Sequence, residues 1–466
     1  MVKELNHKFH ETILRAYDIR GILDSTLSSK DAFFIGTSFG TVLQKKFSGK
    51  KICVGFDGRI SSPELSKSLI KGLFSTGLDI IEIGCVPSPM LYYSVYSEGA
   101  DAGIMITGSH NPPDFNGFKF IMPNRVFYGD DILDLGKISQ NGVFVEGKGT
   151  VVKKDLEENY INKLIEQIAI PENIKIAWDP GNGAASNIIS RLILQLPGKH
   201  YLINGVIDGT FPNHHPDPTV EENLKQLKEV VSTNKCDIGF AFDGDGDRLG
   251  VVDGLGRVIW GDQILAILSR DVLRKNPGSK IIGDVKCSSV FFEEVKKLGG
   301  NPIMWSSGHS LIKAKMMEEG ALLGGEMSAH IFFSDEYFGF DDAIYASLRV
   351  LKTIFNEKKS INHIYDELPK MINTNEIRIE CQETEKFNIV QKIKTSLYNQ
   401  GADILDIDGI RYNSREGWWL LRASNTQACL TIRCEADNEA SLKKIKSDLI
   451  KILKDNKIDI GLEQLY

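Results

Sequence analysis

Residues 102–119 read Ala-Gly-Ile-Met-Ile-Thr-Gly-Ser-His-Asn-Pro-Pro-Asp-Phe-Asn-Gly-Phe-Lys. The first five residues are apolar and predict a short buried strand. Thr107-Gly-Ser109 followed by Asn-Pro-Pro predicts a tight turn directly after it, because asparagine and proline end strands and favour turns. An α/β protein displays a nucleophile in this way, at the carboxyl edge of its sheet. Ser109 is therefore a candidate nucleophile, with an ordinary serine-rich turn as the alternative.

A second short pattern recurs along the chain. Lys-Ile, then apolar residues, then Asp occurs at 51–57, 175–179 and 280–284. After the first copy we expect a helix with Ser62 as its N-cap and Gly77 as its stop, and then another strand. A strand-helix-strand unit predicts a parallel sheet with helices outside. The three copies favour several α/β domains of one design.

The length of 466 residues predicts about three or four domains. The amino-acid composition becomes rich in glycine and lysine near residues 137–153, which indicates a domain boundary. The last hundred residues differ from the rest, with strand-like segments at 377–381, 404–408, 418–422 and 429–433. Helical stretches are expected there near 386–398 and 439–454. The final domain is therefore predicted to be α+β.

The composition is that of a soluble globular protein, with 42% apolar and 25% charged residues. A formal charge of −7 argues against a nucleic-acid partner. The N-terminus has no apolar signal core, and no run approaches the roughly 18 apolar residues of a membrane span. The seven cysteines form no Cys-x-x-Cys pair. We expect a cytoplasmic protein without a membrane or nucleic-acid partner.

A second candidate for chemistry is Asp243-Gly-Asp245-Gly-Asp247-Arg248, which follows an apolar strand. Three carboxylates at alternate positions, with glycines between them, allow the backbone to wrap around one hard cation. A calcium-binding EF-hand loop has a similar opening, but here its sixth position is Arg248 and its twelfth is Gly254. A solvated acidic turn is disfavoured because the three charges would repel one another without a cation. Mg²⁺ is the expected ion, with Arg248 as a neighbouring anion contact.

Residues 213–218, Asn-His-His-Pro-Asp-Pro, also contain metal-binding residue types. The prolines predict a rigid loop. We do not expect His214 or His215 to bind a metal.

Three further polar stretches predict contacts with a sugar phosphate. Residues 306–313 open a helix, and helix N-termini suit phosphate or sugar oxygens. Glu326 and Ser328 lie two residues apart in a glycine-flanked loop, and in extended backbone they would point the same way, toward adjacent sugar hydroxyls. A phosphate cradle without a metal is predicted from one guanidinium, two hydroxyls and an amide. These belong to Arg422, Ser424, Asn425 and Thr426. Taken singly, each stretch is also compatible with an ordinary polar loop.

Taken together and in this order, the motifs resemble those of the α-D-phosphohexomutase superfamily, over essentially the whole chain. Within it, the chain looks most like the bacterial phosphomannomutase/phosphoglucomutase group. The motifs that carry the resemblance are residues 15–21 (Arg-Ala-Tyr-Asp-Ile-Arg-Gly), 107–113, 243–248, 308–313, 325–328 and 422–426. Three departures concern fine substrate preference. Ala329 replaces a usual glycine, Ser306-Ser307 replaces a usual Lys-Thr, and Gln427-Ala428 replaces a more typical Thr-Pro or Glu-Pro.

The resemblance implies an α/β fold of four domains around a central cleft. Three similar α/β domains with mixed sheets would precede a C-terminal α+β domain. The expected domains are residues 1–153, which carry the nucleophile, 154–257, which carry the metal loop, 258–370, which recognise the sugar, and 371–466, which bind phosphate.

The resemblance also implies a reaction. A phosphoryl group would move reversibly between the 1- and 6-positions of mannose or glucose phosphates, through phosphorylated Ser109 and a hexose 1,6-bisphosphate. Mg²⁺ would be held by that phosphate and by Asp243, Asp245 and Asp247, and glucose or mannose 1,6-bisphosphate would act as activator. The alternatives are a phosphoglucosamine mutase and a non-catalytic sugar-phosphate- or metal-binding member of the fold. A monomer is expected.

The same resemblance implies roles for further residues. Glu326 and Ser328 would hold sugar hydroxyls, and residues 422–426 would hold the phosphate that does not react. Lys119 and Arg248 are the nearest candidates for proton transfer. The remaining contacts to phosphate or sugar would come from Tyr17, Arg20, Lys119, Arg248, Lys286, His309 and His330.

Overall fold

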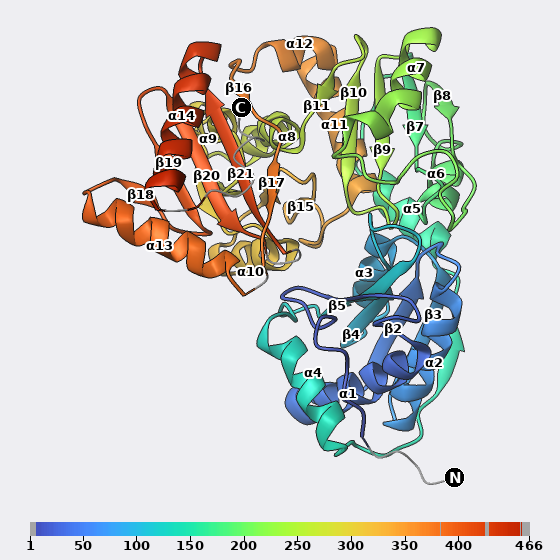
Figure 1. Cartoon of the computed structure of the whole chain (residues 1–466). Coiled ribbons are helices and arrows are strands. Elements are labelled where there is room, and N and C mark those ends of the chain that lie inside the picture. The colour runs from blue at the N-terminus through green and yellow to red at the C-terminus, as the bar shows by residue number, and fades with distance from the viewer. Residues whose placement is uncertain (1–5, 383, 425–427, 457, 459–466) are drawn as a thin grey trace.

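The structure is a computed structural model, which describes residues 6–382, 384–424, 428–456 and 458. Figure 1 shows the sheets following one another in an arc from the N-terminal domain (blue) through green to the C-terminal domain (red). The strands of the described residues form four sheets, one in each of four domains. None of the helices in these ranges is both long and apolar enough to cross a membrane.

The first sheet is mixed, with strand order β1-β5-β4-β2-β3-β6. Its central strands run parallel, whereas β5 is antiparallel to both of its neighbours. The strands are β1 (Ile19–Ile22), β2 (Lys51–Phe56), β3 (Asp79–Cys85), β4 (Ala102–Ile106), β5 (Phe115–Ile121) and β6 (Val151–Lys153). The helices are α1 (Ser29–Phe47), α2 (Ser62–Ser75), α3 (Ser88–Ser97) and α4 (Asp130–Asn141). The strand predicted at 102–106 is confirmed as β4.

The predicted start of α2 is wrong by one residue. Ser61 is the N-cap and Ser62 is the first helical residue. The Ser62 hydroxyl donates instead to the carboxylate of Asp57, at 2.5 Å. The Ser62 hydroxyl is therefore bound to the carboxylate of Asp57, directly after β2, and does not cap the helix backbone as the sequence pattern predicted.

The second and third sheets are also mixed, with orders β11-β10-β9-β7-β8 and β13-β12-β14-β15. The second comprises β7 (Lys175–Asp179), β8 (Lys199–Leu202), β9 (Ile238–Phe242), β10 (Leu249–Asp253) and β11 (Val258–Ile259). Around it lie α5 (Glu157–Ile165), α6 (Ser186–Leu192), the 3₁₀ helix η1 (Glu221–Leu224) and α7 (Lys225–Asn234). The third comprises β12 (Lys280–Asp284), β13 (Asn301–Trp305), β14 (Leu323–Gly325) and β15 (Ile331–Phe333). Its helices are α8 (Gly261–Lys275), α9 (Ser289–Lys297), α10 (His309–Glu319), α11 (Ala343–Glu357) and α12 (Ile361–Asp366).

The fourth sheet is antiparallel, and two helices accompany it, which confirms the predicted α+β character. Its strands are β16 (Ile372–Asn373), β17 (Ile377–Glu380), β18 (Ile404–Leu405), β19 (Ile410–Asn413), β20 (Gly417–Ala423) and β21 (Cys429–Ala436). The helices are α13 (Lys386–Asn399) and α14 (Glu439–Asp455). The strand expected at 404–408 ends at Leu405, because the chain turns back toward β19 through Gly409, whose φ is +83°.

The buried apolar residues separate the last domain from the first three. One hydrophobic cluster runs through the first, second and third domains and includes Tyr92, Trp178 and Tyr345. The fourth domain has a core of its own. Its apolar contact with the third domain is a small cluster of Val285, Trp418 and Leu420, with Met304 packed against it.

Candidate active site

Residues from all four domains line one cavity of about 450 Å³. An adjoining cavity of about 760 Å³ shares Arg248, Lys286 and Ser328 with it. The predicted site residues that line the first cavity are Tyr17, Arg20, Ser109, Lys119, Arg248, Lys286, His309, Glu326, Ser328, His330, Arg422 and Ser424. Asn425 and Thr426 lie outside the described residues. The structure thus brings together motifs that are up to about four hundred residues apart in the sequence.

Ser109 lies in the turn after β4, in the left-handed backbone region with φ +50°. Its N–H donates to the Oγ1 atom of Thr107 at 2.7 Å. Its hydroxyl lies 3.0 Å from the Oδ2 atom of Asp243. The candidate nucleophile is therefore held by its own turn and directed at the predicted metal loop.

The metal loop, residues 243–248, lies against this turn. A Cβ atom added to Gly244 would be 2.4 Å from the carbonyl oxygen of Ser109, so the approach requires glycine. The carboxylates of Asp243, Asp245 and Asp247 are fully buried, with oxygens within 4.8 Å of one another. No hydrogen bond within the described residues reaches the buried Oδ1 atom of Asp245. Three buried carboxylates with spare acceptor capacity fit a small divalent cation.

Lys119, on β5, brings positive charge to the same carboxylates. Its Nζ atom lies 2.7 Å from the Oδ2 atom of Asp245 and also contacts Asp247. Burial alone would lower the pKa of Lys119, but these two carboxylates outweigh it and hold the pKa well above its ordinary value. Burial, together with Asp247 and Asp245, raises the pKa of Asp243 well above its ordinary value. The loop concentrates more negative charge than one ammonium group neutralises.

Two histidines lie beside the metal loop, with ring centroids 5.6 Å apart. The Nδ1 atom of His330 is 2.9 Å from the Oε2 atom of Glu326, and its Nε2 atom is 3.2 Å from the Oδ1 atom of Asp247. Burial opposes protonation of His330, but the Asp247 carboxylate outweighs it and raises the pKa to about 9. Burial, with the charge of Lys313, lowers the pKa of His309 well below its ordinary value. Arg248 lies on the same side, its Nε atom 3.3 Å from the Nε2 atom of His330.

The loop with Glu326 and Ser328 is not extended, so the predicted geometry is wrong. The N–H of Ala329 donates to the carbonyl oxygen of Glu326 at 2.9 Å, which closes a turn. Ala329 adopts φ +70°, a conformation that glycine would take without strain. Glu326 accepts the N–H of Gly308 at 2.6 Å. Burial would raise the pKa of Glu326, but the hydrogen bond from His330 outweighs it and lowers the pKa to about 2.

The candidate phosphate cradle lies where β20 ends. Both the Nε and the Nη2 atoms of Arg422 contact the Oδ2 atom of Asp408, at 3.1 and 2.9 Å. The same oxygen accepts the N–H of Ser307, at 3.0 Å, from the third domain. Lys286 lies 3.5 Å from Glu376 across the same junction. One carboxylate therefore orients the guanidinium and connects the fourth domain to Ser307 of the third domain.

The N-terminal motif reaches the cleft from the first domain. The hydroxyl of Tyr17 donates to the carbonyl oxygen of Ser307 at 3.0 Å. Arg20 pairs with Asp18 at 2.5 Å and also donates to Asn111. Both side chains line the cavity with Ser109.

Sequence reasoning missed the role of the aspartates that end the three repeated strands. Asp57 accepts the hydroxyl of Thr107 at 2.8 Å. Asp179 accepts the N–H of Gly181 at 3.0 Å. Asp284 accepts the N–H of Met327 at 3.1 Å. The repeat itself carried the signal, since each carboxylate organises a loop at the carboxyl edge of its sheet.

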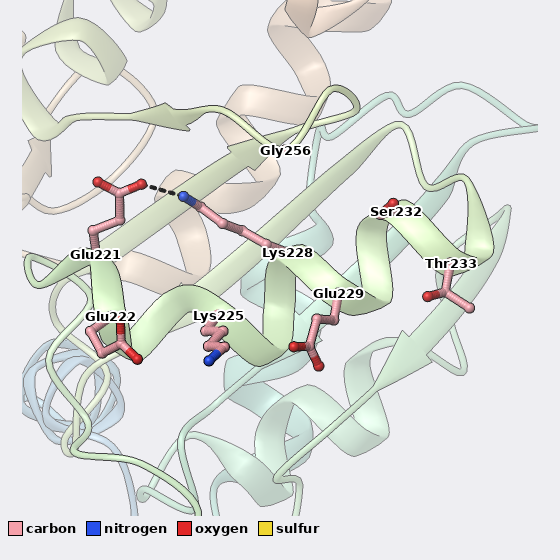
Figure 2. A pocket seen from close by; sticks show the side chains of 8 residues that line it. All are labelled: Glu221, Glu222, Lys225, Lys228, Glu229, Ser232, Thr233 and Gly256. Atoms are coloured by element: carbon pink, nitrogen blue, oxygen red, sulfur yellow. Dashed lines mark hydrogen bonds and ion pairs between the residues drawn. The ribbon is translucent and has the colours of Figure 1, made fainter.

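Two other regions carry no predicted chemistry. His214 pairs with Asp179 at 3.0 Å, and neither His214 nor His215 belongs to a metal-capable group within the described residues. Figure 2 shows a depression along η1 and α7, where Lys228 pairs with Glu221. Its lining contains both acidic and basic side chains and includes none of the predicted site residues.

The fold and the site define a four-domain α/β protein whose candidate nucleophile, carboxylate loop and candidate phosphate cradle line one cleft. Models of one protein family match its four domains in order. Phosphoglucomutase/phosphomannomutase alpha/beta/alpha domains I, II and III match residues 11–138, 158–256 and 260–372. The C-terminal domain of the same family matches residues 376–452. The chain belongs to the phosphoglucomutase/phosphomannomutase family.

Individual relatives are similar to this chain over nearly its whole length. The chain is 41% identical over 437 residues to a phosphomannomutase/phosphoglucomutase of Pseudomonas aeruginosa, covering 94% of each chain. It is 38% identical over 448 residues to a phosphoglucomutase of Neisseria gonorrhoeae, covering 95% of this chain and 97% of the relative. The crystal structure of a family protein from Burkholderia thailandensis superposes with a TM-score of 0.91 at 37% identity, covering 97% and 99% of the two chains.

Proposed function

We propose that this chain is a phosphomannomutase/phosphoglucomutase, which moves a phosphoryl group between the 1- and 6-positions of mannose and glucose phosphates. The observation that carries the proposal is the Ser109 hydroxyl, 3.0 Å from Asp243 in a cavity that Arg422 also lines. A reacting group and a holding group within one cleft suit a substrate with two phosphate positions. Family membership supports the same activity.

The reaction requires two transfers through one serine. In the first, the bond between phosphorus and Oγ of Ser109 breaks and a bond to O6 of the 1-phosphate forms. The resulting hexose 1,6-bisphosphate turns round in the cleft. In the second, phosphorus at O1 returns to Oγ of Ser109, and O1 is protonated. The serine ends as it began, so the net reaction moves one phosphoryl group within one sugar.

The chain supplies charge for these transfers. The carboxylates of Asp243, Asp245 and Asp247, with the phosphate on Ser109, would hold Mg²⁺, which when bound supplies positive charge to the transferring group. Lys119 and Arg248 add fixed positive charge at the same place, where it stabilises the equatorial oxygens. Lys286, Arg422 and Ser424 hold the phosphate that does not react. We keep Asn425 and Thr426 in this cradle from the family motif.

The sugar hydroxyl must lose a proton in one transfer and regain it in the other. Arginine stays protonated in proteins, and the Lys119 ammonium group is held by two carboxylates. The carboxylates of Glu326 and Asp247 hold His330 in the same way, so the imidazole rings of His309 and His330 join Lys119 and Arg248 as candidates for the proton exchange. Glu326 and Ser328 hold the sugar hydroxyls, and Tyr17 and Arg20 complete the cleft.

The proposal includes four domains, formed by residues 1–153, 154–257, 258–370 and 371–466.

Glucose or mannose 1,6-bisphosphate would activate the unphosphorylated enzyme by the reverse of the first transfer. Each bisphosphate carries the phosphoryl group that Ser109 needs to enter the cycle.

Intact-mass analysis before and after incubation with glucose 1,6-bisphosphate tests the phosphoserine. We expect one added phosphoryl group, mapped to Ser109 by peptide analysis. The Ser109→Ala variant should keep its fold, gain no phosphoryl group and lose on the order of 10³-fold or more in turnover. Wild-type turnover in that variant, or phosphorylation at another residue, would overturn the proposal.

The substrate class has its own test. We expect kcat/KM for mannose 1-phosphate and glucose 1-phosphate to agree within about tenfold, because one hydroxyl distinguishes them and one pocket contact discriminates only modestly. Glucosamine 1-phosphate is the control substrate. A marked preference for the amino sugar would favour the phosphoglucosamine mutase alternative.

A further inference from the structure

We propose that Arg59 is a positioning residue for the phosphoryl transfer, which holds the nucleophile loop, residues 107–115, in its working conformation. The inference rests on the proposed function of Ser109. Arg59 lies in the turn between β2 and α2, fifty residues before the nucleophile. It does not appear among the cavity-lining residues.

Five hydrogen bonds from the guanidinium group of Arg59 reach the nucleophile loop and Asp57. The Nη2 atom donates to the carbonyl oxygens of Ser109, at 2.7 Å, and Asn111, at 2.6 Å. The Nη1 atom donates to the carbonyl oxygens of Pro112 and of Phe115, the latter at 3.0 Å. Because arginine carries five N–H donors in a rigid fork, the fifth bond, from Nε to Asp57, uses the last of them.

The packing shows that this arrangement is tight. The side chain of Arg59 is 0% exposed. A Cβ atom added to Gly108 would lie 2.5 Å from the Cζ atom of Arg59, so only glycine allows the guanidinium to lie against the loop. The ring of Phe211, from the second domain, stacks over the same group at 5.3 Å. The guanidinium is therefore enclosed between the nucleophile loop and the domain that carries the metal loop.

Asp57 connects Arg59 with the nucleophile by a second route. Its Oδ2 atom accepts from the Nε atom of Arg59 at 3.1 Å and from the hydroxyl of Thr107 at 2.8 Å. The Thr107 hydroxyl oxygen in turn accepts the N–H of Ser109. Asp57 and Arg59 thus fix the amide and the carbonyl on the two sides of one residue.

Such support has a physical purpose at Ser109. A non-glycine residue in the left-handed region is strained, and this conformation persists only where the surroundings hold it. The buried carbonyl groups of an irregular loop also need donors. Both transfers must meet phosphorus at one position, and a displacement of about 1 Å can lower the rate about a hundredfold.

The test is Arg59→Lys, which keeps one positive charge but cannot reach four carbonyl groups. Arg349→Lys is the matched control. The side chain of Arg349 is also 0% exposed, and it pairs with Asp335 at 2.8 Å. Arg349 belongs to α11 and does not line the cavity. Both variants and the wild type are first phosphorylated with glucose 1,6-bisphosphate. The measurements are kcat, KM for glucose 1-phosphate, thermal stability and the ³¹P resonance of the phosphoserine.

We expect Arg59→Lys to lower kcat about 10–100-fold with KM changed less than about threefold, and to shift or broaden the ³¹P resonance. Arg349→Lys should lose thermal stability but keep kcat within about twofold and the resonance unchanged. A wild-type kcat for folded Arg59→Lys, or an equal loss in both variants, overturns the inference. A rise in KM of Arg59→Lys that is as large as its fall in kcat also overturns the inference.

Asp57→Asn keeps the inference testable if Arg59→Lys does not fold. It leaves the four carbonyl contacts of Arg59 in place and removes the charge that aligns the guanidinium, so kcat should fall about 3–10-fold with KM unchanged. An unchanged kcat in Asp57→Asn would overturn the inference in that case. A wild-type enzyme that takes up no phosphoryl group would instead refute the proposed function.

Discussion

The two ends of the cleft are connected to the rest of the molecule in different ways. At the reacting end, Gly244 lies directly on the carbonyl group of Ser109, and the N–H of Ser88 donates to the carbonyl oxygen of Asp245 at 2.8 Å. At the holding end, the fourth domain meets the third through Asp408, through further hydrogen bonds and ion pairs such as those of Arg411 and Arg433, and through a small apolar cluster. The first two domains also share a hydrophobic core with the third, whereas the fourth domain has a core of its own.

This difference in contacts predicts a different free-energy cost for separating the domains at the two ends. Separating the first two domains would expose shared apolar core, which costs free energy roughly in proportion to area. Separating the fourth domain mostly exchanges polar contacts for contacts with water, at a smaller cost per bond. We therefore expect the fourth domain to separate from the third at a lower cost in free energy than the first domain from the second. Four experiments test this difference between the two ends of the cleft.

The largest effect is expected from removing the metal, which acts at the reacting end. Exhaustive chelation should lower turnover on the order of 10³-fold, because the charge of the cation contributes several kcal/mol to the transition state. Added Mg²⁺ should restore turnover. The phosphate already on Ser109 should remain, as intact mass would show. Full turnover after complete metal removal would contradict the assignment of the carboxylate loop.

The next effect concerns the holding end. Charge-assisted hydrogen bonds contribute roughly 1.5–3 kcal/mol each, so Arg422→Ala should lower kcat/KM about 10–100-fold. The variant should also release more free hexose 1,6-bisphosphate per turnover, because the clamp must retain it while it turns. Arg415→Ala, at an exposed position of the same domain, is the control and should behave as wild type. Unchanged KM together with unchanged escape would remove Arg422 from the site.

A smaller effect is expected at Asp408, which orients Arg422 and contacts Ser307. Asp408→Asn keeps an acceptor but loses the charge, so kcat/KM should fall about 3–10-fold. Asp406→Asn is the control, because Asp406 belongs to the same turn but pairs with Lys394 instead, at 2.7 Å. A rise in kcat/KM for Asp408→Asn would mean that Asp408 competes with the substrate phosphate for Arg422.

The sequence predicted most of what local patterns determine. The apolar run before Thr107 and the glycines between the three aspartates determine a strand, a turn and a wrapped loop whatever surrounds them. The turn at Ala329 gave no such signal, because an alanine with positive φ is indistinguishable in sequence from any other alanine. Contacts such as that of Arg59 with Ser109 depend on the packed fold, since fifty residues separate the partners.

The same distinction explains the error at Ser62 and the missed role of Asp408. A serine before proline is a good N-cap by local rules, but the buried carboxylate of Asp57 takes its hydroxyl. Asp408 was part of a predicted strand, and its partner Ser307 lies a hundred residues earlier. Residues that hold the site are thus harder to predict than residues that touch the substrate, because their partners are set by tertiary structure.

The smallest effect tests the support of the reacting end through pH. The loop with His214 packs on the metal loop, since a Cβ atom added to Gly244 would lie 3.5 Å from Pro216. Burial would lower the pKa of His214, but the hydrogen bond and charge of Asp179 outweigh it and raise the pKa above its ordinary value of 6.5. The protonated form therefore favours the fold. Its contribution is complete below the unfolded value and is lost as pH rises through the folded value.

His214→Gln should accordingly lower the free energy of unfolding by about 1 kcal/mol near pH 6 and by less near pH 9, as thermal unfolding at the two pH values would show. His10→Gln, at an exposed position, is the control and should give the same small difference at both. If His214→Gln lowered the free energy of unfolding equally at both pH values, the loop would be held by Pro216 and the backbone alone. A smaller difference at high pH would show that the ion pair of His214 with Asp179 helps to hold the loop that packs on the metal loop.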